Sequence, residues 1–348
     1  MRVFKFVLVG VLCSVLLVML AVGLLLGTEG GSRWALARVP GLQVNDFQGR
    51  LAGRWQASQL SWSDGASRVQ VQAPLLSWSP GCLLRATLCI DQLHAQRIDM
   101  AFGPSDQPAD SGPVQLPVLR LPVAIELGEL KVGQLRLDGS DVLGDLHLAA
   151  HWTAAGLRVD SLQLQRDDLR VDVQGNVQPE GDWPLQLQGQ VQLPAVQGQA
   201  WQLALTATGE LHKALELDAT SSGYLDARLT GQVQALAEHL PATLHIRADA
   251  FKAAASLPDT LQLNQLKLDA TGDLLNGYRL SGSASLPAEQ APIALALTGK
   301  VDAKGAQLDA LDLSASDSQR VKLQASADWQ QGLTADARVD WQDFPWLR

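Results

Sequence analysis

The sequence predicts a mostly β protein: an N-terminal transmembrane helix followed by a long, elongated β region. Residues 183–194, WPLQLQGQVQLP, place Leu185 and Leu187 on one side of an extended chain and Gln186 and Gln188 on the other. This period of two is typical of a strand with one apolar and one polar face. Similar segments recur along most of the chain, and almost no segment has the pattern of an amphipathic helix that could cover the apolar side.

The first element is an apolar run from Phe6 to Thr28 that contains no charged residue. At 1.5 Å per residue it is long enough to cross a hydrocarbon core of about 30 Å. Arg2 and Lys5 precede it, so the positive-inside rule predicts a cytoplasmic N-terminus and export of everything after Thr28. The alternative is a cleaved signal peptide, but such a peptide has a shorter apolar region and a small-residue cleavage site. We therefore expect residues 1–28 to be a cytoplasmic tip and an uncleaved signal anchor.

Residues 29–102 are expected to form a membrane-proximal helix and a first β segment. The helix fits residues 28–39 and is ended by Pro40. Short strands follow, separated by Gly and Pro. Cys82 and Cys89 are close together in an otherwise Cys-free exported region, which favours a disulfide in an oxidising compartment. Two independent buried thiols are the alternative.

Residues 103–117 contain four prolines and no apolar period, which predicts a solvated loop. Residues 118–348 then return to alternating strands. In one of them the phase slips at Asn264 and Gln265, as a β-bulge would require. The whole chain gives about 20 strands, more than an ordinary open sheet holds. Either two sandwiches or one long, curled sheet would satisfy this pattern.

Composition and motifs exclude several functions. Lys and Arg number 27 against 36 Asp and Glu, and the net charge of −9 leaves no basic stripe for nucleic acid. Phosphate-binding loops, dinucleotide fingerprints and nucleophile elbows are absent from the sequence. His147 and His151 are four apart, but on a strand this spacing is about 13 Å and no zinc-site Glu accompanies it. We predict no enzyme activity and no catalytic, cofactor or metal site.

One stretch of the chain carries a family resemblance. The anchor, the proximal helix, the G-R-L-x-G turn from Gly49 to Gly53 and the W-x-P-x-x-L element at Trp78, Pro80 and Leu83 occur in that order. Residues 1–102 resemble in this way the amino-terminal region of the TamB family, within the AsmA-like group of envelope proteins. The ending WQDFPWLR resembles a segment found inside family members, so we expect an amino-terminal fragment.

The resemblance implies a single-pass inner-membrane protein whose periplasmic part is a long, U-shaped β-sheet with an apolar interior groove. It also implies a role in phospholipid transport between the two membranes and in outer-membrane protein assembly. The BamA-like outer-membrane protein TamA is the partner it implies. The resemblance places the domain linked to that partner at the carboxyl terminus of family members, and we expect that domain to lie outside this sequence.

The expected occupants of the groove are phospholipid acyl chains, because an apolar patch of this size is rarely left exposed. Their attraction, about 0.8 kcal/mol per buried CH₂, is non-directional and would allow sliding. A scaffold that binds nascent outer-membrane strands at a sheet edge is one alternative, and an anchored sandwich with a filled core is another. The lipid-groove candidates are Leu185, Leu187, Val191, Leu193, Leu261, Leu263, Leu266, Leu268, Leu295 and Leu297.

Overall fold

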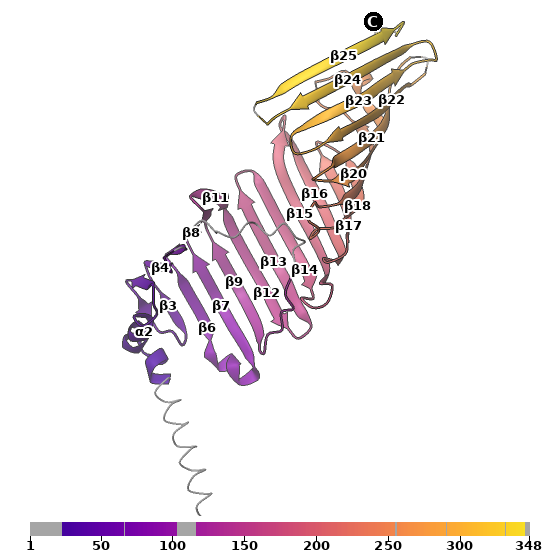
Figure 1. Ribbon diagram of the computed structural model, residues 1–348. Coiled ribbons are helices and arrows are strands. Elements are labelled where there is room, and N and C mark those ends of the chain that lie inside the picture. Colours follow the sequence, from indigo (N-terminus) through magenta and orange to yellow (C-terminus); the bar gives the residue numbers. More distant parts are fainter. Residues whose placement is uncertain are drawn as a thin grey trace, which may run out of the picture. The chain divides into compact units, whose positions relative to one another are not determined.

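The computed structural model describes residues 23–65, 67–102, 116–254, 256–289, 291–330 and 332–344 (Figure 1). These residues divide into two units. The first unit holds most of the chain up to Asp167, and the second holds nearly everything from Gly175 onward. No helix within the described ranges is long and apolar enough to cross a membrane. Most of the expected span, residues 1–22, and most of the proline-rich loop lie outside these ranges.

The helix of the first unit is α2, Glu29–Leu36. Thr28 caps it, because its hydroxyl oxygen accepts the backbone N–H of Gly31 at 3.2 Å. Ser32 is fully buried. Its hydroxyl donates to the carbonyl of Leu26 at 3.2 Å and accepts the N–H of Leu51 at 3.0 Å. The helix expected over residues 28–39 is thus present in a shorter form. It is hydrogen-bonded through Ser32 to Leu51, which lies between the first strands of the unit.

The first unit contains two sheets. In the smaller one the strands lie in the order β1-β4-β5-β8-β10-β11, with β8 and β10 parallel. In the larger one β2, β3, β6, β7, β9, β12 and β13 pair in that order, and β7 and β9 are parallel. The smaller sheet comprises β1 (Leu42–Asn45), β4 (Gln59–Ser63), β5 (Arg68–Gln72), β8 (Arg97–Ala101), β10 (Leu135–Leu137) and β11 (Ser140–Leu143). The first-unit strands of the larger one are β2 (Gln48–Gly49), β3 (Arg54–Gln56), β6 (Leu75–Ser79), β7 (Thr87–Ala95), β9 (Ala124–Val132), β12 (Asp145–Thr153) and β13 (Gly156–Arg166).

Between β6 and β7 the chain makes a 3-10 turn, η1, at Pro80–Arg85. Cys82 and Cys89 are joined by a disulfide across this turn, with their Cα atoms 5.9 Å apart. Ala86 adopts a left-handed conformation at the end of the turn, with φ of 53°. The turn therefore reverses the chain within a covalently closed loop.

The second unit is an antiparallel meander in which each strand from β15 to β25 pairs with the next. β14 (Leu169–Val177) contributes residues to both units. A 3-10 turn, η2, spans Asp259–Leu261. The strands are β15 (Pro184–Val196), β16 (Gln199–Glu210), β17 (Leu215–Gly223), β18 (Ala227–Val233), β19 (Ala242–Phe251), β20 (Leu263–Asp273), β21 (Gly277–Leu286), β22 (Ile293–Val301), β23 (Gly305–Ser314), β24 (Arg320–Asp328) and β25 (Thr334–Gln342).

The expected slip of phase in β20 is present. The pairing of β20 with β21 shifts register between Asn264 and Lys267. Gln265 there has a φ of 54°, which is the left-handed region. The bulge returns Leu266 and Leu268 to the apolar face after the irregular step.

Candidate functional site: an apolar sheet face

The apolar face of the second unit begins on β15. Leu185 is buried, and Leu187, Val191 and Leu193 are half-buried, whereas the alternating glutamines are exposed. The strand thus has the two-faced character that its sequence predicts. β16 continues the pattern, because Leu205 and Leu203 lie opposite Gly189 and Val191.

The cross-strand register aligns apolar residues into unbroken rows across eleven strands, β15 to β25. Each member of a row is the direct partner of the next. The first row is Gly189, Leu205, Ala219, Leu229, Ile246, Leu268, Gly282, Leu297, Leu311, Leu323 and Val339. The second row is Leu187, Ala207, Leu217, Gly231, Leu244, Ala270, Leu280, Gly299, Leu308, Ala325 and Ala337.

Leucines in these rows lean over glycines of the adjoining strand. A Cβ on Gly231 would stand 2.8 Å from a methyl carbon of Leu244. A Cβ on Gly282 would stand 3.2 Å from a methyl carbon of Leu268 and 3.4 Å from one of Leu297. The missing side chains are thus replaced by their neighbours' methyl groups, which gives the face a more even apolar surface.

Within the described part of the second unit, the strands make their extensive contacts only with their neighbours in the sheet. The buried cluster of this unit is small and lies toward its last strands, at Ile293, Val321 and Phe344. Most leucines of the two rows therefore remain half-buried, covered by adjacent side chains of the same face. Apolar surface of this extent is typical of a binding site rather than of an ordinary protein surface.

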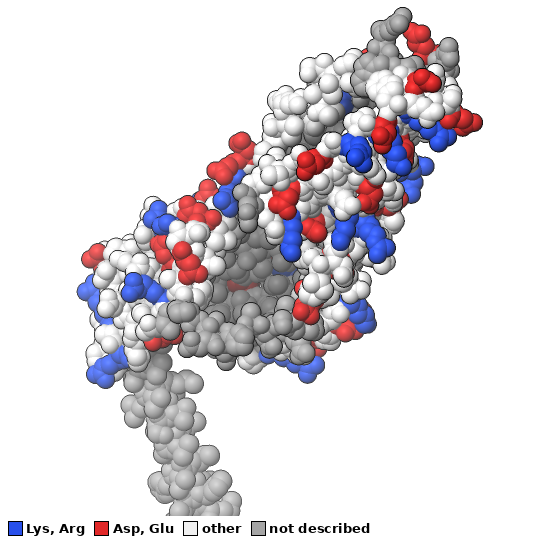
Figure 2. Space-filling model, turned by 45° about the horizontal axis from the view of Figure 1, so that its top comes forward, with Lys and Arg blue, Asp and Glu red and all other residues white. Residues whose placement is uncertain are grey.

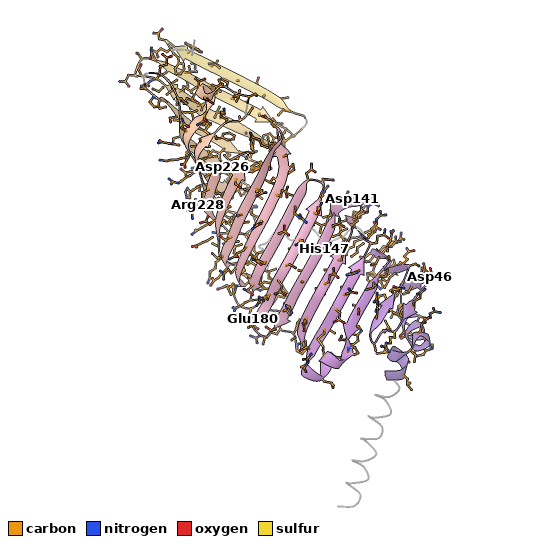
Figure 3. The ribbon with its side chains drawn as sticks, turned by 180° about the vertical axis from the view of Figure 1, so that it is seen from behind. Asp46, Asp141, His147, Glu180, Asp226 and Arg228 are labelled. Carbon is orange, nitrogen blue, oxygen red and sulfur yellow. A yellow bond between two sulfur atoms is a disulfide. The ribbon has the colours of Figure 1, made fainter. Side chains whose placement is uncertain are left out.

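The opposite face of the same strands is polar and charged. Figure 2 shows Lys, Arg, Asp and Glu intermingled over the side of this unit that is turned toward the viewer. Arg228, labelled in Figure 3, donates to Asp218 at 2.5 and 3.2 Å. This hydrogen bond lowers the pKa of the Asp218 carboxyl below its usual value. His245 pairs with Asp269 on the same face. The sheet thus separates a solvated face from an apolar one.

The residues expected to line a groove divide into three groups. Leu187, Leu268 and Leu297 lie in the two rows, and Leu185 begins a third row through Gly209 and Leu215. Leu261 lies in the 3-10 turn η2, outside the strands, and its side chain is 41% exposed. The remaining candidates, Val191, Leu193, Leu263, Leu266 and Leu295, point to the apolar face nearer the strand ends, opposite Leu203, Trp201, Phe251, Ala248 and Ala284 respectively.

Many row members were not identified from the sequence. Leu205, Leu217, Leu311 and Leu323 carry the same period of two and could have been found by it. The glycines and alanines that complete the rows carry no such signal, because their place depends on the register between strands.

Within the described ranges no three His, Cys, Asp or Glu side chains are grouped to hold a metal ion. His147, labelled in Figure 3, and His151 both lie on β12. The Nδ1 atom of His151 pairs with Asp160 of the neighbouring strand. Its ring is therefore engaged in a cross-strand pair.

Comparison with known proteins identifies the family of the chain. The family model described as "TamB, N-terminal domain" matches residues 17–141 and 111–345. The translocation and assembly module subunit TamB of Haemophilus influenzae is 27% identical over 201 residues, which cover 53% of this chain and 15% of that protein. No solved structure matches the chain. Because the family model matches well over half of the sequence, the chain belongs to the TamB N-terminal domain family.

Proposed function

We propose that this chain is an inner-membrane-anchored envelope protein whose apolar sheet face holds phospholipid acyl chains in passage between the inner and outer membranes. The observation that carries the proposal is the pair of unbroken apolar rows across eleven strands, half-exposed along most of their length. Acyl chains laid on this face would gain about 0.8 kcal/mol per buried CH₂. The apolar sequence before Thr28 supports the anchor, and the groove would be a curled form of this sheet.

Lipid movement along the rows needs no specific site. Burial of apolar surface has no preferred direction, and each row offers a methyl-covered surface at every strand spacing of about 4.8 Å. Delivered lipid would support assembly at the outer membrane. The name of the Haemophilus influenzae relative, a translocation and assembly module subunit, supports this context.

The test is to interrupt one row with a charge. Leu297→Asp places a carboxylate in the middle of the first row, and Thr298→Asp places one on the exposed side of the same strand. We expect Leu297→Asp to reduce the phospholipid that co-purifies with the full chain several-fold, and Thr298→Asp to leave it unchanged. Protease resistance of both variants checks their folding. If Leu297→Asp unfolds the chain while the wild type carries no lipid, the face is an ordinary core and the proposal fails.

A second candidate is a scaffold that binds nascent outer-membrane strands. In the smaller sheet β11 pairs with β10 alone among the described strands, and three of its four residues are exposed. An extended peptide could add to this edge through main-chain hydrogen bonds. Photo-crosslinkers on β11 that capture outer-membrane proteins, with no lipid on the apolar rows, would favour this function over lipid transport.

A further inference from the structure

The η1 turn of the first unit presents two leucines to solvent. Leu84 is 93% exposed and Leu83 is 48% exposed. Arg85 follows them, with a guanidinium nitrogen 3.6 Å from the sulfur of Cys82. Just before β9, Leu121 is 42% exposed. It lies at the same end of the sheet, because Ala124 at the start of β9 is paired with Thr87 at the start of β7.

The conformation of this turn is constrained, so its leucines cannot readily become buried. The disulfide between Cys82 and Cys89 closes it, and Cys89 is buried in β7. Just before the turn, the indole N–H of Trp78 donates to the carbonyl of Leu51 at 2.6 Å. The disulfide therefore holds two apolar side chains in an exposed turn.

The turn lies close to the point where the apolar N-terminal segment enters the first unit. Residues 23–27 are helical, and the carbonyl of Leu26 accepts the N–H of Ala52 at 2.9 Å. The next residue, Gly53, accepts the N–H of Trp78 at 3.3 Å, two residues before the turn begins. Figure 1 shows the β6–β7 turn at the end of these strands that also lies toward this helix.

Resting on the membrane anchor of the proposed function, we propose that the η1 turn is a second membrane contact, in which Leu83 and Leu84 enter the outer leaflet of the anchoring bilayer. A lipid surface is the partner that fits, because an apolar pair followed by an arginine matches acyl chains beneath anionic phosphates. Trp34 of α2, 52% exposed with Arg38 packed over its ring at 4.5 Å, is suited to the same interface. Two contacts would fix the tilt of the first unit on the membrane, which one helix alone cannot do.

The experiment uses the full chain in vesicles of phosphatidylethanolamine and phosphatidylglycerol, about three to one in composition to include anionic lipid. A benzophenone amino acid replaces Leu84 or, as control, Leu137, an exposed leucine at the far end of the unit. We expect at least fivefold more lipid adduct from position 84. Equal yields, or adducts from position 84 to protein alone, would overturn the proposal.

A second measurement separates this contact from the apolar rows and from misfolding. With the benzophenone at Leu121, the double change Leu83→Ser and Leu84→Ser should lower lipid adducts at least threefold. Cys82 and Cys89 should stay protected from thiol reagents, which shows that the turn is intact. The adduct yield from position 84 should also be unchanged by Leu297→Asp. An unchanged yield from Leu121 in the double variant, or a loss in Leu297→Asp, would contradict a membrane contact of the turn itself.

Discussion

At the scale of single residues, the glycines of the apolar rows have a packing role. A Cβ on Gly231 would meet the backbone oxygen of Thr243 at 2.2 Å as well as the methyl group of Leu244. On Gly282 the nearest backbone oxygen, that of Lys267, would be 3.1 Å away. An added Cβ at the first position would therefore overlap backbone atoms, whereas at the second it would meet its nearest neighbours, one backbone oxygen and two leucine methyl groups, at 3.1–3.4 Å.

We predict that Gly231→Ala lowers the free energy of unfolding by about 1–3 kcal/mol, as overpacking does. Gly282→Ala should lower the free energy of unfolding by less than Gly231→Ala does. Ser281→Ala, on the exposed side of β21, is the control and should change it by less than about 0.5 kcal/mol. Denaturant titration of the three variants provides the measurement. A Gly231→Ala protein as stable as the wild type would contradict the close approach of Leu244.

A second residue-scale feature is the carboxylate at the β22–β23 turn. One oxygen of Asp302 accepts the backbone N–H groups of Lys304 and Gly305 at 2.8 and 3.0 Å. These hydrogen bonds, with that from Lys304 the larger cause, lower the pKa of Asp302. A carboxyl group whose pKa is lower in the folded state stabilises the fold at pH values above its unfolded pKa of about 3.9. This stabilisation is lost as the pH falls through the folded-state pKa.

Asp302→Asn should therefore lower the thermal unfolding midpoint at pH 7. The difference in unfolding midpoint between variant and wild type should become smaller as the pH falls below about 4, because the wild-type carboxylate then becomes protonated. Thermal scans from pH 7 to pH 3 measure this. A gap that stays constant with pH would mean that the ionised carboxylate contributes nothing to the turn.

At the scale of elements, the η1 turn of the first unit is closed by the disulfide between Cys82 and Cys89. In a chain produced in an oxidising compartment both thiols should resist labelling until reductant is added. Replacing both with serine should lower stability by about 2 kcal/mol, the loop-closure value for so short a loop. Free labelling of both cysteines without reductant would show that the bond does not form there.

Strands in which apolar and polar residues alternate regularly could be predicted from the sequence. Elements that depend on turn residues, or on pairing with distant strands, could not. Period two identified β15 and the bulge of β20 at Asn264 and Gln265. It also suggested that Leu261 belongs to the row, but Pro258 precedes a 3-10 turn that ends at this residue. The parallel pairing of β8 with β10 joins segments more than 30 residues apart, and no local pattern encodes it.

At the scale of the whole molecule, the sequence predicts that each strand has an apolar and a polar face, but it does not predict the cross-strand rows. A row depends on which residues lie opposite one another, and register follows from turns and bulges spread over the second unit. Gly299, for example, completes a row between Leu280 and Leu308 only because the β22–β23 pairing shifts beside it. The sequence therefore predicts an apolar face but does not show that it is uninterrupted.

Contact between lipid and the apolar face of strands β15 to β25 is tested most directly by photo-crosslinking in intact cells. Benzophenone at Leu187 and Leu311, one in each row, is compared with benzophenone at the neighbouring exposed residues Gln188 and Asp312. We predict phospholipid adducts, identified by mass spectrometry, from both leucine positions and few from the exposed ones. Equal lipid capture from the two faces, or none from the leucines, would contradict the account.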